Sequence, residues 1–275
     1  MLELYQFGNS VCAQKVRITM SEKGLDWETH EINLFASEQY SPAYLKLNRK
    51  GVVPTLISEG QPIIESTLIC EYLDEIYPEP SLMPASAFGR SQMRLWSKAV
   101  DEGLFEGVVE LSFCAMFRDR MKNMTDEQRL IRFANVGDPR RRDRFMSTYE
   151  KGTSSPYVFH GIAAYEKSFN NMERDLGDDR DWLMGQHFTL ADINLIPLVA
   201  RLDYLQILDI WTAGRPKILM WWERARNRPS FTGGITRHFK EGEVDEMKAY
   251  GLKIKDQIVS LHNDYLIQFR LNKLI

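Results

Sequence analysis

The sequence predicts an α/β domain followed by an all-α domain, because its hydrophobic pattern changes once along the chain. Up to about residue 80, short runs that alternate apolar and polar residues stand between helical periods. Residues 78–84 then contain three prolines, which end the first domain. Only long helical periods follow. A chain of 275 residues is long enough for two such domains.

The elements of the first domain follow from periodicity and from turn residues. Gly24 stops the first helix, and Glu59-Gly60 is a tight-turn signal between two short strands that should form a hairpin. The expected strands and helices cover, in chain order, residues 2–7, 13–23, 27–34, 55–58, 62–64 and a helix from 66 onward. With one more helix before the hairpin, the order β-α-β-α-β-β-α is that of a thioredoxin-like domain.

The second domain is expected to be all-helical. Long helical periods cover residues 88–121 and 157–176, and Pro216 suits the first turn of a last core helix. Thr189-Leu190-Ala191-Asp192 is a capping box with Asp in place of Glu. Phe188 and Ile193 flank it at the two positions of a hydrophobic staple.

These patterns predict four parts of the chain. They are a thioredoxin-like domain over residues 1–80, a linker over 81–87, an all-helical domain over 88–239, and a helical extension over 240–275 that begins near Val244. Residues 122–156 exceed a minimal helical domain and contain the basic run Arg140–Arg144. Because Asp143 interrupts this run and no aromatic residue is interleaved, we interpret it as a solvated loop.

Composition excludes several classes of function. The net charge of −3 provides no general attraction to nucleic acid or to an anionic membrane, and no apolar run approaches the length of a membrane span. Cys12, Cys70 and Cys114 are too few and too scattered for a disulfide framework or a metal cluster, so no metal site is expected. No signal peptide is evident, and a cytoplasmic protein is the expectation.

Two local motifs are typical of ligand binding. Pro54 stands between the apolar run Val52-Val53 and a predicted strand, where a cis peptide bond would turn the preceding backbone outward toward an extended ligand. Glu65-Ser66 opens the next helix, and a helix N-terminus is a suitable site for a carboxylate.

Three motifs together resemble the glutathione transferase superfamily, over about residues 2–230. They are residues 48–56, Glu65-Ser66-Thr67 and Phe188–Asp192. The resemblance implies that glutathione is the co-substrate and that Val53, ahead of a cis Pro54, pairs its backbone with the cysteinyl part. It also implies that Glu65 and Ser66 hold the γ-glutamyl end, and that Gln39 and Lys50 lie near the glycyl end.

Ser10 is the first catalytic candidate. It precedes the first helix, where serine-type, theta- or zeta-like members of the superfamily carry a hydroxyl that donates to the glutathione sulfur. A thiol with a pKa of about 8.5 is only partly ionised at neutral pH, so a hydrogen bond and the helix dipole would both favour the thiolate. The alternative is that Ser10 is only a helix N-cap.

Cys12 is the second catalytic candidate. Ser10-Val11-Cys12 resembles the corresponding stretch of tetrachlorohydroquinone dehalogenases, in which the cysteine resolves a glutathionyl adduct by thiol exchange. On that hypothesis the chain is a glutathione-dependent reductive dehalogenase or thiol transferase. The alternative is that Cys12 packs as a small buried hydrophobe. A third hypothesis is a non-catalytic module that keeps the fold for binding.

The electrophile is expected to be hydrophobic. Residues 65–73 and 94–102 resemble the glutathione-dependent β-aryl etherases, which displace a phenol from carbon. An acceptor pocket between the two domains is expected to be lined by Phe7, Phe113, Met116 and Phe117, although the aromatics on the long helix could instead form its core stripe. The resemblance also implies a homodimer, with the helix around residues 94–102 near the two-fold axis.

Overall fold

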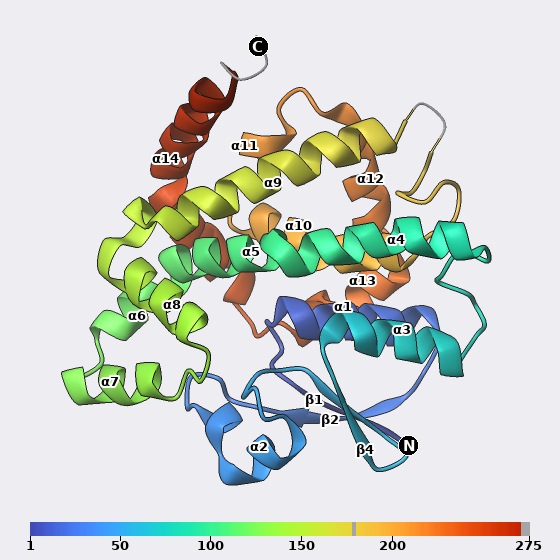
Figure 1. Cartoon of the computed structure of the whole chain (residues 1–275), viewed down its shortest axis with the longest axis horizontal. Helices are drawn as coiled ribbons and strands as arrows, with labels where there is room; N and C mark the ends of the chain where they lie inside the picture. The colour runs from blue at the N-terminus through green and yellow to red at the C-terminus, as the bar shows by residue number, and fades with distance from the viewer. Residues whose placement is uncertain (178–179, 271–275) are drawn as a thin grey trace. The chain divides into compact units, whose positions relative to one another are not determined.

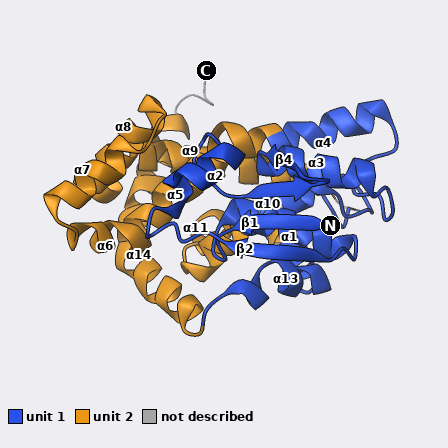
Figure 2. Cartoon of the chain, turned by 90° about the horizontal axis from the view of Figure 1, so that it is seen from below, with its two compact units in different colours: residues 1–97, 178–197, 220–240 blue, residues 98–177, 198–219, 241–275 orange. Residues whose placement is uncertain are grey.

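The computed structural model describes residues 1–177 and 180–270 and divides them into two compact units (Figure 2). Within the described residues, unit 1 is formed by residues 1–97, 180–197 and 220–240, and unit 2 by residues 98–177, 198–219 and 241–270. The units therefore combine segments that are far apart in the sequence, whereas the predicted domain limits follow the chain. No helix of the described chain combines the length and apolarity that crossing a bilayer requires.

A four-stranded sheet organises the first part of unit 1. Its strand order is β2-β1-β3-β4, with β1 parallel to β2 and antiparallel to β3, and with β3 and β4 forming a hairpin. The strands are β1 (Leu2–Gln6), β2 (Trp27–Glu31), β3 (Thr55–Ser58) and β4 (Gln61–Ile64). The predicted strands and hairpin are confirmed, although β2 ends three residues earlier than the alternating pattern suggested.

Three helices pack on this sheet. They are α1 (Val11–Glu22), α2 (Pro42–Leu47) and α3 (Ser66–Ile76). Figure 1 shows α1 and α3 on one face of the sheet and α2 on the other. The core between sheet and helices is apolar and fully buried, with Leu4, Leu56, Val16, Ile69 and Leu73 at its centre. This is the thioredoxin-like arrangement that the element order predicts.

The rest of unit 1 is helical. It contains most of α4 (Ala87–Ala99), the first part of α10 (Leu190–Tyr204), most of α12 (Pro216–Arg226), α13 (Pro229–Gly234) and the short η5 (Thr236–His238). α13 packs against α1. Pro216 and Pro229 each begin a helix, as expected for a residue that fixes φ and lacks an N–H donor.

The predicted capping box surrounds a buried carboxylate. Asp192 is fully buried and accepts hydrogen bonds from the backbone N–H of Thr189 at 3.0 Å and of Leu183 at 3.0 Å. The indole N–H of Trp221 donates to the same carboxylate at 2.9 Å. Phe188 and Ile193, the expected staple residues, are both buried. One side chain therefore joins α10, α12 and the turn before α10.

Unit 2 is entirely helical over its described residues. Its helices are α5 (Phe105–Ser112), α6 (Arg118–Lys122), α7 (Asp126–Ala134), α8 (Pro139–Lys151), α9 (Pro156–Asp175), α11 (Asp209–Thr212) and α14 (Glu243–Arg270). α14 confirms the predicted C-terminal helix. α5 and α9 pack very closely at two glycines. A Cβ added to Gly107 would lie only 3.0 Å from the Cα of Gly161.

Two expectations for unit 2 are corrected. The single helix predicted over residues 88–121 is interrupted by two π-helical segments, η2 (Val100–Leu104) and η3 (Phe113–Phe117). The prediction of a loop at the basic run 140–144 is also wrong, since these residues lie within α8. Asp138 caps α8 by accepting from the N–H of Arg140 at 2.9 Å, and Arg144 pairs with Glu106 on α5. These ion pairs give the run a structural role.

Candidate functional site

One edge of the sheet collects the ligand-binding motifs. Tyr5 on β1 lies opposite Thr55 on β3, and Thr55 lies opposite Ile64 on β4. Because β3 is antiparallel to both neighbours, the segments that follow β1, precede β3 and follow β4 all leave the sheet beyond this row of residues. The loop with Ser10, the Val53-Pro54 pair and the Glu65-Ser66 pair are therefore brought to the same edge by the strand register.

Ser10 is the N-cap of α1. Its Oγ accepts a hydrogen bond from the N–H of Ala13 at 3.3 Å, and its own N–H donates to the carbonyl of Phe7 at 2.9 Å. Ser10 thus caps the helix, as one of the two interpretations of it predicted. The cap uses only a lone pair of the oxygen, so the hydroxyl proton can still be donated to a ligand. Ser10 is half-buried.

The peptide bond between Val53 and Pro54 is cis, as predicted. The loop before it is fixed by side chains of unit 1. The hydroxyl of Tyr44 donates to the carbonyl of Val52 at 2.6 Å, and the amide of Asn48 donates to the same carbonyl at 2.9 Å. The backbone just before β3 is therefore held in one conformation by Tyr44 of α2 and by Asn48, the C-cap of that helix.

Glu65 precedes α3 with an unusual backbone conformation, φ +70° and ψ +107°. Its carboxylate lies 2.6 Å from the ammonium of Lys50, and both side chains are largely exposed. Ser66, the first residue of α3, is buried. Left-handed φ values in residues other than glycine cost free energy and concentrate at functional sites, so this backbone supports a role for Glu65 in binding.

A buried lysine joins the first turns of the two helices at this edge. Lys15 of α1 is 3% exposed, and its ammonium donates to the hydroxyl of Thr67 on α3 at 3.2 Å.

Gln39 lies in η1 (Glu38–Tyr40) and is also buried. Among the described residues, its Oε1 has no hydrogen-bond partner. A buried acceptor of this kind is available to a ligand that brings a donor.

The three cysteines differ in environment. Cys12 lies in the first turn of α1 and is partly exposed, whereas the alternative of a small hydrophobe expected a buried side chain. Burial raises the pKa of the Cys70 thiol to about 11 and that of the Cys114 thiol to about 12. Those two thiols remain protonated at neutral pH and fill the core.

The proposed acceptor residues divide between the units. Phe7 belongs to unit 1 and packs edge-on against Phe35 at a centroid distance of 5.6 Å. In unit 2, Phe113 and Met116 are buried, and Phe113 stacks on Phe145 at 6.0 Å. Phe117 is partly exposed. Within unit 2, Phe113 and Met116 thus contribute to the core stripe of the long helix.

Unit 2 also contains a cavity of about 1090 Å³ between α5, α8, α9 and the end of α14. None of the four proposed acceptor residues is among those that line it. Its lining includes Arg144, which pairs with Glu106 and Glu110, and Arg140, which pairs with Asp138. This charged lining does not match a hydrophobic electrophile.

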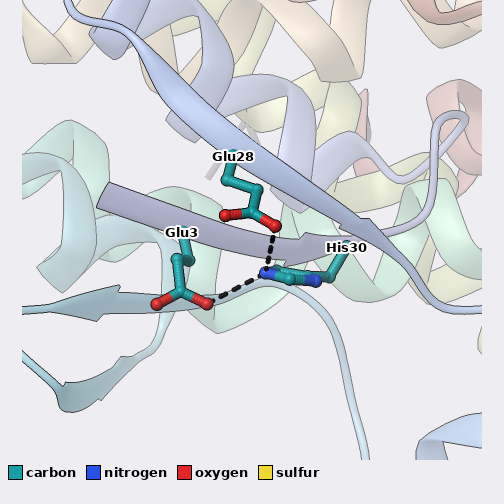
Figure 3. A group of neighbouring side chains, drawn as sticks. All are labelled: Glu3, Glu28 and His30. Carbon is teal, nitrogen blue, oxygen red and sulfur yellow. Dashed lines mark hydrogen bonds and ion pairs between the residues drawn. The ribbon is translucent and has the colours of Figure 1, made fainter. Parts of the chain in front are cut away.

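A further cluster lies on β1 and β2 and was not singled out from the sequence. The Nε2 of His30 is 2.9 Å from the Oε2 of Glu3 and 3.7 Å from the Oε1 of Glu28 (Figure 3). Glu3 and Glu28 are register partners on adjacent strands, so His30 separates two like charges. The imidazole of His30 also stacks on Tyr5 at 4.4 Å. One atom from each of the three side chains lies within 4.8 Å of the others, close enough to hold a metal ion, but the contacts among them already account for the arrangement.

Family models match both parts of the chain. A model of the glutathione S-transferase N-terminal domain matches residues 4–81, and a model of the glutathione S-transferase C-terminal domain matches residues 139–224. Maleylacetoacetate isomerase of Pseudomonas aeruginosa is 30% identical over 84% of this chain and 93% of its own length. The tetrachloro-p-hydroquinone reductive dehalogenase of Sphingobium chlorophenolicum is 25% identical over 88% of this chain and 98% of its own length.

Protein LigF of Sphingobium sp. is similar in sequence and in structure. Its sequence is 38% identical over 129 residues, which cover 46% of this chain and only half of LigF. The crystal structure of LigF, described as a β-etherase, superposes with a TM-score of 0.75 and 28% identity. That superposition covers 85% of this chain and 98% of LigF.

Proposed function

Since the chain belongs to the glutathione S-transferase family, we propose that it activates the thiol of glutathione for attack on a hydrophobic electrophile. The observation that carries this proposal is the common sheet edge. The register of β1, β3 and β4 gathers there a helix-capping hydroxyl, a cis-proline loop and the strained start of α3. The family resemblance assigns a part of glutathione to each of them.

In the proposed complex, the hydroxyl of Ser10 donates to the glutathione sulfur. The hydrogen bond and the positive end of the α1 dipole both favour the thiolate over the thiol. The backbone of Val53 pairs with the cysteinyl residue of glutathione. Glu65 holds the γ-glutamyl ammonium, and Ser66 and the first amides of α3 hold its carboxylate.

Lys50 and Gln39 are proposed to receive the glycyl end. Lys50 supplies a positive charge, which now pairs with Glu65 at the surface and can turn to an anionic ligand at little cost. The buried Oε1 of Gln39 can accept a hydrogen bond from the N–H of a peptide. Both residues belong to unit 1 together with the other proposed contacts.

The proposed electrophile is an aromatic compound with a leaving group on carbon, and a β-aryl ether is the first candidate. The likeness to LigF supports this class. The thiolate sulfur attacks the ether carbon and forms a thioether, while the C–O bond breaks and the phenolate leaves with its electron pair and then takes a proton from water. Within unit 2, Phe113, Met116 and Phe117 are proposed to contact this electrophile. We further propose that the protein acts as a cytoplasmic homodimer.

A second candidate function uses Cys12. The observation that favours it is the partial exposure of this thiol in the first turn of α1, where the helix dipole favours a thiolate. Glutathione would first displace a halide from an aromatic substrate, and the Cys12 thiolate would then attack the sulfur of the adduct. The carbon–sulfur bond would break, a proton would replace sulfur on carbon, and a mixed disulfide of Cys12 and glutathione would remain.

The test is to incubate the purified protein with glutathione and three substrates, namely a β-aryl ether, a halogenated hydroquinone and a chlorinated nitrobenzene. Mass spectrometry then identifies the products. A glutathione thioether that requires Ser10 supports the transferase proposal, and a Cys12 mixed disulfide that survives Ser10→Ala supports the second candidate. Retention on immobilised glutathione without any product would instead indicate a non-catalytic binding module.

A further inference from the structure

Gly8, two residues before Ser10, is held through both of its backbone polar groups. Its N–H donates to the Oε1 of Glu31 on β2 at 2.8 Å. Its carbonyl accepts from the guanidinium of Arg17 on α1 at 2.8 Å. The N–H of Ser10 then donates to the carbonyl of Phe7 at 2.9 Å, which closes the turn around Gly8. The loop that presents the Ser10 hydroxyl is therefore anchored at its centre.

The anchoring guanidinium is unusual because it is fully buried. Arg17 is 0% exposed and donates from its Nε to the carbonyl of Gly234 in α13 at 2.7 Å, and from a terminal nitrogen to the Oε1 of Gln6. The amide of Gln6 reaches the Glu31 carboxylate at 3.4 Å, so Gln6 links the two anchors. Burial lowers the pKa of Arg17 to about 9, while the charge of Glu31 opposes the shift. Arg17 still carries a charge at neutral pH.

Packing leaves the loop little room to move. A Cβ on Gly8 would lie 2.7 Å from the carbonyl oxygen of His238, which belongs to η5. Glycine is required here for close approach of two backbones rather than for its φ angle. The loop is thus bounded by β2, α1 and the segment after α13, all within unit 1.

We propose that Arg17 and Glu31 are positioning residues that fix the Ser10 hydroxyl relative to the bound thiol. This inference rests on the proposed function of Ser10. Burying a guanidinium costs solvation, and apolar replacements of buried charges are often neutral or stabilising. A misplacement of about 1 Å at a reacting group, in contrast, can cost about a hundredfold in rate. The five hydrogen bonds of the Arg17–Gln6–Glu31 network are suited to preventing such a displacement.

Glu31 offers the cleanest test, because it is exposed and its variants should fold. Glu31→Ala removes the acceptor of the Gly8 N–H, whereas Glu31→Gln keeps an oxygen acceptor. Glu28→Ala is the matched control on the same strand, since the ion pair of Glu28 with His30 lies outside the network that holds Gly8. Arg17→Lys keeps the charge but loses the fork that reaches three acceptors.

The first measurement is hydrogen exchange at the amides of Gly8 and Ser10. Loss of a hydrogen bond to a charged acceptor should speed exchange in Glu31→Ala by about tenfold or more. The second measurement is the pKa of glutathione bound to each variant. We expect it to rise in Glu31→Ala and Arg17→Lys, with kcat lowered about tenfold and the KM for glutathione within about twofold of wild type. Glu28→Ala should behave like wild type. Glu31→Gln keeps one oxygen for the Gly8 N–H but turns its amide nitrogen toward Gln6, so its effects should lie between those of wild type and Glu31→Ala.

Two outcomes would overturn the inference. Unchanged exchange at Gly8 in Glu31→Ala would show that the carboxylate does not hold the loop. Faster exchange with an unchanged thiol pKa and kcat would show that the network stabilises the loop without positioning Ser10. A wild-type protein that forms no bound thiolate would refute the proposed function itself, and with it this inference, and that failure is visible before any variant is made.

Discussion

Glu65 has a strained backbone conformation, and its side chain is a proposed ligand contact. Substitutions of Glu65 can therefore distinguish its effect on stability from its effect on glutathione binding. At φ +70° a residue with a Cβ is disfavoured, and such positions cost about 1–3 kcal/mol. We predict the effects of Glu65→Gly and of Glu65→Ala as a matched pair. Both remove the carboxylate, but only glycine relieves the backbone.

The magnitudes follow from three contributions. Relief of strain stabilises Glu65→Gly by about 2 kcal/mol, and the entropy of glycine in the unfolded chain removes about 0.5–1 kcal/mol of this. Loss of the exposed ion pair with Lys50 costs both variants the same small amount, at most about 1 kcal/mol. Glu65→Gly should therefore be more stable than Glu65→Ala by about 1 kcal/mol, or about 2–4 °C in Tm.

Binding should respond in the opposite way. Both variants lose the proposed partner of the γ-glutamyl ammonium, so the KM for glutathione should rise about tenfold in each. Thermal denaturation and steady-state kinetics on the same preparations provide both values. A glycine variant less stable than the alanine variant would refute the strain argument. An unchanged KM in both variants would refute the assignment of Glu65 to glutathione binding.

Three further predictions concern other side chains. Asp192→Asn places an amide nitrogen against donors that now share a carboxylate, and should destabilise the protein by about 3 kcal/mol, measured by urea denaturation. Burial alone would raise the pKa of Glu166, but hydrogen bonds, chiefly from His262, hold it at about 2, against 4.5 for the free group. The ionised Glu166 therefore contributes its full stabilisation above pH 4.5, and this contribution is lost as the pH falls toward 2. The free energy of unfolding of Glu166→Gln should thus fall less steeply with decreasing pH than that of wild type. An equally steep fall in both proteins would contradict the assignment. Cys12→Ser should leave glutathione transfer within about twofold of wild type while Ser10→Ala lowers it at least tenfold, and the reverse order would favour the second candidate function.

The parts predicted correctly from the sequence are those that local chemistry specifies. The cis bond before Pro54, the hairpin at Glu59-Gly60, the start of α3 at Ser66 and the pairing of Thr189 with Asp192 each depend on residues within a few positions of one another. Turn residues and caps act over that range. The site candidates were found because three such motifs occur in one order.

The features that were missed depend on contacts between distant segments. Arg17 appears in the sequence as one charged residue among the apolar positions of α1, and its acceptors at Gly8 and Gly234 become visible only in the folded unit. The basic run 140–144 was interpreted as a loop, but it lies in α8, where ion pairs from Arg144 to α5 stabilise a run that looks fully solvated. A charged residue inside an otherwise buried helix is the signal that could have identified Arg17.

The most direct test of the central claim is the ultraviolet absorbance of the glutathione thiolate, recorded against pH with wild-type protein and with Ser10→Ala. We predict that the thiol bound to the wild type has a pKa well below its ordinary value of about 8.5, and that the pKa rises when the Ser10 hydroxyl is removed. A bound thiol whose pKa is the same in both proteins would contradict the assignment of Ser10 as the group that stabilises the thiolate.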